Sequence, residues 1–189
     1  MIHYYTNREI AEKLEINLAR WKRWSRSFLA PDPLGGMQSG YTRQYVFKDL
    51  LKVFLGGHLL SHLKLSVAES RQVLTDLSPW LKKHGFFDQP GGNGTGATQK
   101  KPPAGCRIYF SALPAMKAKD APAVGYLIRR TLGRKIHGAA VSRQIMEIVE
   151  ETLLHCDLPD GRAFLELPQV YLINLSALFL WLIEKLNEA

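Results

Sequence analysis

The sequence predicts a protein of the α+β class, with a helical N-terminal domain, a flexible Gly/Pro linker and a small α+β C-terminal domain. Between residues 6 and 83, apolar side chains recur at helical spacing and two helix starts carry capping boxes. Residues 90–105 contain five glycines, three prolines and no large apolar side chain, which is typical of a linker. Short apolar runs and one long amphipathic segment follow. The expected domains are residues 1–88, 89–105 and 106–189.

Net charge is unevenly distributed along the chain. The 189 residues have a formal charge of +8, and residues 1–85 contain 13 Lys/Arg against 7 Asp/Glu. A basic domain favours an anionic partner. The most apolar window, residues 170–183, is shorter than the roughly 20 residues that cross a bilayer, and no secretory segment is visible, so we expect a soluble, cytoplasmic protein without a membrane partner.

The first two helices have clear start signals. Thr6 and Glu9 form a capping box, and Glu15-Ile16-Asn17 is a tight turn in which Asn17 caps the next helix. The second helix, residues 18–27, places Trp21, Trp24 and Phe28 on one side, which we expect to be buried. Its other sides carry four cations: Arg20, Lys22, Arg23 and Arg26.

Further along, residues 34–45 contain three glycines among polar residues and predict a β-hairpin wing. A helix is expected over 47–63, where Gly56-Gly57 implies either close packing or a bend. Ser66 and Glu69 form a second capping box, and Pro79 is expected to restart that helix with Ser78 as its cap.

This order of elements resembles the MerR family of bacterial winged-helix transcription factors over about 80 residues. The matching segments are Tyr5-Thr6, Glu9-Ile10-Ala11, Trp21-Lys22-Arg23-Trp24, Gly40 to Tyr45 with Asp49-Leu50, and Leu63 to Glu69. The chain departs from the family pattern at Glu15, which stands where the family has a glycine, at Lys22 and at Trp24. It also runs into the linker where many members continue into a long dimerisation helix.

The resemblance implies that helix 18–27 enters the DNA major groove while wing 35–45 lies on the backbone. Base edges would face Leu18, Ala19, Arg20 and Arg23. Phosphates would be held by Lys22, Arg26 and Arg43, with Tyr41 beside Arg43 on the wing. Tyr45 is expected in the wing core, although it could also donate to a phosphate.

The C-terminal domain has several expected elements. Short strands are predicted at 107–110, 126–128, 164–167 and 170–175. An amphipathic helix is predicted from about Ala139 to Cys156, and a last helix, capped by Ser176, continues through Leu186.

Other chemically suggestive residues have simpler interpretations. The two tryptophans could stack on bases, but their spacing favours the core. His58 and His62 have a metal-compatible spacing without a third ligand nearby, so no metal is expected. His155-Cys156-Asp157 is interpreted as a helix end rather than a nucleophile and base.

We therefore expect a sequence-specific transcriptional regulator rather than an enzyme, with no cofactor. Double-stranded DNA would be bound by a homodimer, because one winged helix makes few base contacts. The C-terminal domain would provide the dimer contact or sense an effector. The alternative function is a protein-interaction adaptor built on a repurposed winged helix.

Overall fold

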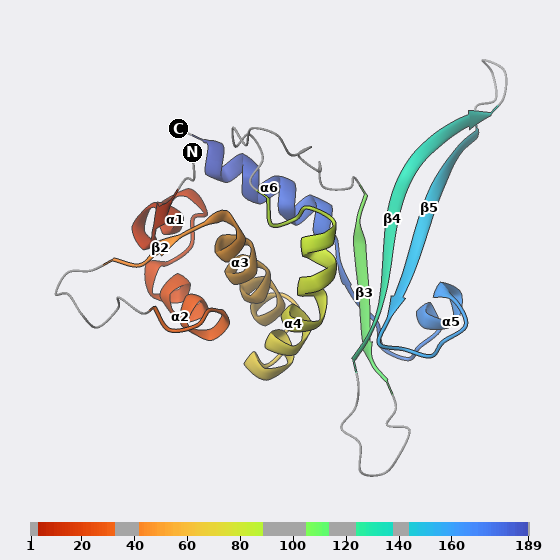
Figure 1. The fold of residues 1–189 in the computed structure, drawn as a ribbon, viewed down its shortest axis with the longest axis horizontal. Helices are drawn as coiled ribbons and strands as arrows, with labels where there is room; N and C mark the ends of the chain where they lie inside the picture. Colours follow the sequence, from red (N-terminus) through yellow and green to blue (C-terminus); the bar gives the residue numbers. More distant parts are fainter. Residues whose placement is uncertain (1–3, 33–41, 89–104, 114–123, 138–143, 189) are drawn as a thin grey trace, which may run out of the picture. The chain divides into compact units, whose positions relative to one another are not determined.

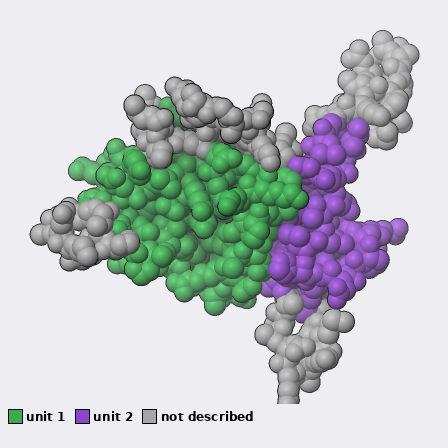
Figure 2. Space-filling model, viewed as in Figure 1, with its two compact units in different colours: residues 1–102, 178–189 green, residues 103–177 purple. Residues whose placement is uncertain are grey.

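The computed structural model describes residues 4–32, 42–88, 105–113, 124–137 and 144–188 (Figure 1). It divides into two compact units, coloured separately in Figure 2. Unit 1 contains residues 1–102 and 178–189, and unit 2 contains residues 103–177. Both helices and antiparallel sheets are present, so the α+β class is confirmed at this level. Most of the expected linker lies outside the described residues.

Unit 1 begins with two short helices whose starts match the sequence signals. Helix α1 (Asn7–Lys13) has the expected capping box between Thr6 and Glu9. Helix α2 (Leu18–Phe28) is capped by Asn17, whose side-chain oxygen accepts from the amides of Ala19 (2.9 Å) and Arg20 (3.3 Å). These hydrogen bonds satisfy amides that have no partner within the helix.

A small sheet joins the start of unit 1 to the end of the expected wing. Strand β1 (Tyr5–Thr6) pairs antiparallel with β2 (Gln44–Tyr45), in the register Tyr5↔Tyr45. The remainder of the wing falls largely on residues 33–41, outside the described residues. Strand β2 leads directly into α3 (Phe47–Ser61).

The two adjacent glycines of α3 mark close packing against α2. A Cβ added at Gly56 would overlap the ring of Phe28, and one at Gly57 would overlap the ring of Trp24. The glycines therefore let the aromatic side of α2 approach the α3 backbone. Of the two expectations for Gly56-Gly57, close packing or a bend, the structure shows close packing. The side of α2 predicted to be buried is thus the side that faces α3.

Helix α4 (Val67–Lys83) begins with the expected capping box of Ser66 and Glu69. The predicted restart at Pro79 is wrong, because the proline lies inside one continuous helix. Ser78 does not act as an N-cap, since its hydroxyl donates to the carbonyl of Leu74 at 2.6 Å. Pro79 has no backbone N–H to donate to the preceding turn of the helix. Because Pro79 is exposed, water can donate to the carbonyl that is left without this partner.

The C-terminal helix α6 (Leu175–Asn187) contributes most of its length to unit 1. Phe179 makes edge-on contacts with Phe47 and Phe86, at ring-centroid distances of 5.6 and 5.4 Å. Leu182 and Leu186 are buried as well. The sequence-based division, which kept residues 106–189 together, differs at this point because these aromatic contacts join residues far apart in the chain.

The described residues of unit 2 form a four-stranded antiparallel sheet in the order β5-β4-β3-β6 and a short helix (Figure 1). Its strands are β3 (Arg107–Ala112), β4 (Val124–His137), β5 (Gln144–Leu154) and β6 (Tyr171–Ile173). Helix α5 (Gly161–Leu165) lies beside β5, and its Phe164 is fully buried. The strands predicted at 107–110 and 126–128 are confirmed within β3 and β4, and the strand predicted at 170–175 within β6.

Two predictions for unit 2 are wrong. The segment expected as a helix over 139–156 forms β5, which pairs with β4 along its whole length. The segment expected as a strand over 164–167 overlaps α5, because Asp160 caps this helix by accepting from the Ala163 amide at 2.8 Å.

The last helix forms as expected, but Asn174, rather than Ser176, accepts from its first turn. Ser176 instead accepts from the backbone amide of Cys106.

Within the residues that the structure describes, no helix has both the length and the apolar character needed to span a bilayer.

Candidate nucleic-acid interface

The turn between α1 and α2 has the geometry of a tight helix–helix connection. Glu15 lies in the left-handed region with φ of 53°, an uncommon conformation for a residue with a side chain. The amide of Ile16 donates to the carbonyl of Ala11 at 3.0 Å and closes α1.

One side of α2 is anchored in the core of unit 1. Trp21 is fully buried and Trp24 is 7% exposed. The Trp21 ring meets the Tyr45 ring edge-on at 5.7 Å. Neither indole is available for stacking on a base, so the core interpretation of both tryptophans is confirmed. This anchoring fixes which face of α2 points to solvent.

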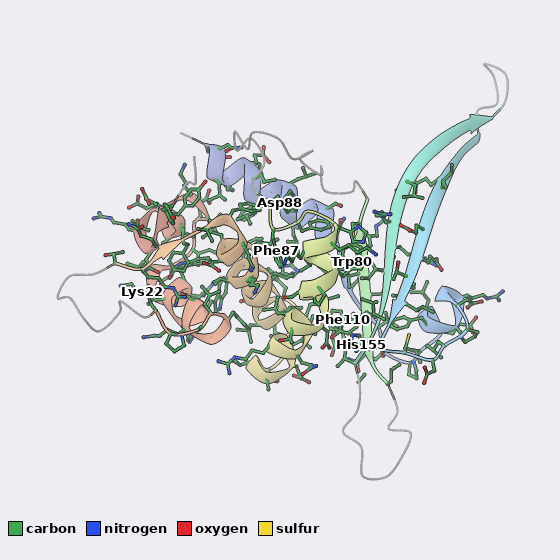
Figure 3. The ribbon with its side chains drawn as sticks, in the orientation of Figure 1. Lys22, Trp80, Phe87, Asp88, Phe110 and His155 are labelled. Atoms are coloured by element: carbon green, nitrogen blue, oxygen red, sulfur yellow. The ribbon has the colours of Figure 1, made fainter. Side chains whose placement is uncertain are left out.

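The opposite side of α2 is the main candidate interface. Six of the predicted contact residues on this helix are exposed: Leu18, Ala19, Arg20, Lys22, Arg23 and Arg26. Lys22 is labelled in Figure 3. None of the four cations forms an ion pair with a described residue. A helix that presents unpaired cations at successive turns can contact the phosphates of a duplex.

The two predicted wing residues differ from this group. Tyr41 lies outside the described residues. Arg43 is half-buried, with its Nε atom 3.9 Å from Oδ2 of Asp32 and its guanidinium 5.6 Å from the centre of the Tyr45 ring. Part of its charge is therefore balanced within the protein, which leaves Arg43 less available to an anion than the cations of α2.

Tyr45 connects the small sheet to both helices. Its hydroxyl donates to Oδ1 of Asn7 at 2.7 Å and lies 2.8 Å from the hydroxyl of Ser25. Since the single proton of Tyr45 goes to Asn7, the Ser25 hydroxyl is the donor in the second hydrogen bond. Tyr45 is 1% exposed, so it belongs to the core and is not a phosphate donor.

Two adjoining hollows lie beside the exposed face of α2. Their volumes are about 510 and 330 Å³, and four residues line both of them: Asn7, Lys22, Asp32 and Arg43. Arg8, at the start of α1, lines the smaller hollow together with Thr42. Sequence reasoning missed Asn7, Arg8 and Thr42. The N-terminal position of Arg8 on α1 was the available signal, because the first turns of two adjacent helices can meet the same ligand.

The histidines and cysteines among the described residues do not form a metal site or an activated nucleophile. The rings of His58 and His62 stack at 4.6 Å, but across the described ranges no group of three or more potential metal ligands converges. Burial, and then the charge of His62, lowers the pKa of His58. Burial raises the pKa of the Cys106 thiol to about 12, with the charge of Arg130 opposing, so this cysteine is a poor nucleophile.

The sequence His155-Cys156-Asp157 follows strand β5, so the prediction that it ends a helix is wrong. His155 has φ of 55° and meets the Tyr126 ring edge-on at 6.0 Å.

Comparison with known proteins does not add to this description: no family model matches the chain, and no curated protein matches it.

Proposed function

We propose that this protein is a sequence-specific DNA-binding transcriptional regulator of the MerR type. Helix α2 would enter the major groove and residues 35–45 would lie on the phosphate backbone. In its first turn, Leu18, Ala19 and Arg20 would meet base edges together with Arg23 from the next turn. Lys22 and Arg26 would hold phosphates on either side.

The observation that carries the proposal is the two-sided character of α2. Its tryptophans are buried against α3 and β2, whereas its four cations are exposed and form no ion pair with any described residue. Solvated cations on an ordinary surface helix are usually interspersed with acidic residues. Helix α2 contains no acidic residue, so all the charged side chains that it exposes are positive.

A homodimer follows from the requirements of specificity. A single helix reads only a few base pairs, and each mismatch costs about 1–3 kcal/mol. Two copies on an inverted repeat double the number of positions that are read. Unit 2 would supply the contact between the copies or the response to an effector.

The salt dependence of binding tests the proposal. Affinity for a duplex of random sequence is measured at two salt concentrations by fluorescence anisotropy. If α2 neutralises phosphates, affinity falls steeply with salt, because each contact releases condensed counterions. The absence of a salt slope would contradict DNA binding.

The alternative proposal, a protein-interaction adaptor, is favoured by one observation on α6. Leu180 is 63% exposed and Trp181 is 37% exposed, and the Trp181 ring stacks on Phe54 at 5.2 Å. Exposed large apolar side chains are common at protein interfaces. Salt-insensitive, weak binding to DNA together with capture of a protein partner through these residues would favour the adaptor.

A further inference from the structure

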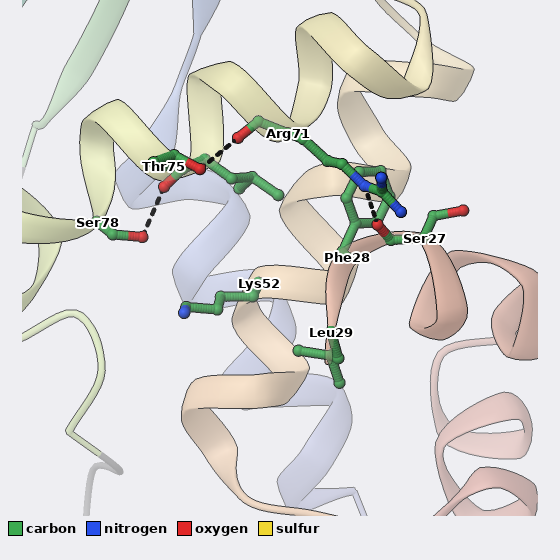
Figure 4. A pocket seen from close by; sticks show the side chains of 8 residues that line it. Ser27, Phe28, Leu29, Lys52, Arg71, Thr75 and Ser78 are labelled. Atoms are coloured by element: carbon green, nitrogen blue, oxygen red, sulfur yellow. Dashed lines mark hydrogen bonds between the residues drawn. The ribbon is translucent and has the colours of Figure 1, made fainter. Parts of the chain in front are cut away.

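A cavity of about 270 Å³ lies where the C-terminal end of α2 meets α3 and α4 (Figure 4). It lies entirely within unit 1, and none of the proposed DNA-contacting residues lines it. Its described lining includes Lys52 from α3, Leu29 after α2, and four residues of α4: Arg71, Leu74, Thr75 and Ser78. No carboxylate belongs to this lining.

Two cations on different helices border this cavity. The Nε atom of Arg71 donates to the carbonyl of Ser27 at 2.6 Å, which satisfies a free carbonyl in the last turn of α2. This hydrogen bond holds the guanidinium in place and leaves its terminal amino groups as further donors. Lys52 supplies the second charge, and its ammonium is also 5.6 Å from the centre of the Phe87 ring. Figure 4 shows the two charged ends on different sides of the cavity, so an anionic group would meet one of them at a time, and no lining carboxylate competes with it.

The two hydroxyls of the lining act as acceptors. Thr75 donates its proton to the carbonyl of Arg71 at 2.8 Å, and Ser78 donates its proton to the carbonyl of Leu74 at 2.6 Å (Figure 4). A hydroxyl whose proton is used in this way offers only lone pairs to a ligand. The matching group on a ligand is therefore a hydrogen-bond donor.

The volume and the apolar lining limit the size of the ligand. About 270 Å³ is the volume of roughly nine water molecules in the liquid, and it falls below the range typical of drug-sized ligands. Leu29 and Leu74 provide apolar contact for a short carbon chain. Polar and apolar groups thus occur together in a small space.

We propose that this cavity binds a small organic anion that carries its own hydroxyl or amino group. The carboxylate or phosphate of the ligand would lie at Lys52, and its donor would meet Thr75 or Ser78, which Figure 4 shows on the same side of the cavity as the Lys52 ammonium. Such a ligand joins α3 to α4 beside the end of α2, and its binding would therefore affect the rigidity of α2. Its regulatory meaning rests on the proposed function, whereas binding itself does not.

Three probes of similar size separate the required features. Lactate carries a carboxylate and a hydroxyl, propionate lacks the hydroxyl, and lactamide lacks the charge. Titration of the full chain without DNA, followed by amide chemical shifts, should show saturable binding of lactate at millimolar concentrations. Propionate should bind about fivefold more weakly and lactamide about tenfold more weakly, as expected for the loss of one hydrogen bond and of one charged contact.

Variants locate the binding. Lys52→Met should weaken lactate binding about tenfold. Lys48→Met is the matched control, because Lys48 faces the same Phe87 ring at 5.7 Å but does not line the cavity, and it should bind lactate like the unmodified chain. Thr75→Val should reduce the preference for lactate over propionate. Identical titrations with the three probes, or equal effects of the two lysine variants, would overturn the proposal.

A second measurement separates this inference from the proposed function. Lactate is added to the chain bound to a duplex, and the change in DNA affinity is recorded. Lactate binding by a chain without DNA affinity would leave the cavity assignment intact and remove the regulator. DNA binding by a chain that does not take up lactate would remove only the cavity assignment.

Discussion

Glu15, in the turn between α1 and α2, combines an unfavourable backbone conformation with an ion pair to α6. Its φ of 53° places the backbone in a region where a side chain costs about 1–2 kcal/mol. Its carboxylate accepts from Nζ of Lys185 at 2.9 Å, a contact between the turn and the end of α6. The ion pair is largely exposed on the Glu15 side and contributes little to stability. The strain and the ion pair can therefore be separated by substitution.

Glu15→Gly should raise the free energy of unfolding of unit 1 by about 1 kcal/mol, because glycine adopts this φ without strain. The control is Glu15→Gln, which keeps the strain and removes the charge, and should change stability little. Urea denaturation of both variants measures the difference. A glycine variant that is no more stable than the glutamine variant would show that the turn is unstrained.

The lowered pKa of His58 should make the stability of unit 1 depend on pH. Because burial and the charge of His62 lower its pKa below the ordinary 6.5, the unfolded state takes up a proton at a higher pH than the folded state. This contribution to stability is therefore complete above pH 6.5 and is lost as pH falls through the window between the ordinary pKa and the lowered one.

Urea denaturation across this window should show stability falling with acidity, and the fall should be smaller in His58→Gln. Leu180→Ala, which removes no titratable group, is the control and should keep the dependence of the unmodified chain. Equal pH dependence in the two variants would contradict the role assigned to His58.

Helix α6 illustrates how one element can belong to a unit far from it in sequence. Phe179 is 1% exposed and contacts two aromatic rings of the first 88 residues, whereas the neighbouring Leu180 is 63% exposed. Unit 1 is thus a helical core completed from the C-terminal end of the chain. Truncation before α6 would expose Phe47 and Phe86.

Phe179→Ala should lower the free energy of unfolding of unit 1 by about 3–5 kcal/mol, as expected for the loss of a buried aromatic ring. Leu180→Ala removes an apolar side chain from the adjacent position and should stay within about 0.5 kcal/mol of the unmodified chain. Denaturation followed by tryptophan fluorescence reports on this unit, because all four tryptophans belong to it. Equal effects of the two substitutions would mean that α6 does not pack as described.

Elements with local signals were predictable from the sequence. The capping boxes at Thr6 and Ser66, and Asn17 before α2, involve residues two or three positions apart, so the sequence contains the complete interaction. Strand β5 was not predictable in this way. Its apolar residues fit a helical spacing, but its ladder with β4 joins residues 7 to 28 positions apart, and Arg129 pairs with Glu151 at 2.6 Å, so the strand depends on contacts with another segment.

The candidate interface was predictable to a similar extent. The spacing of Trp21 and Trp24 indicated the buried side of α2 and thereby its exposed cations. The ion pair of Arg43 with Asp32 and the convergence of Asn7 and Arg8 on Lys22 depend on tertiary contacts. No local pattern in the sequence contains them.

At the scale of the whole molecule, charge and architecture favour the same function. The chain carries a formal charge of +8, and residues 1–85 hold 13 of its 25 Lys/Arg. Helix α2, which contains no acidic residue, belongs to this half of the chain. If the protein binds DNA as a dimer, two such helices act together, and the affinity of the complex depends strongly on salt.

Double substitution of Arg23 and Arg26 by alanine tests the central claim most directly. The matched control is Lys82→Ala with Lys83→Ala, which removes two exposed cations from α4 in the same unit. DNA affinity is measured over a range of salt concentrations for the unmodified chain and both variants. The arginine variant should bind more weakly, with a salt slope smaller by about two, and the lysine variant should match the unmodified chain. Equal slopes for the two variants would contradict the assignment of α2 as the DNA-contacting helix.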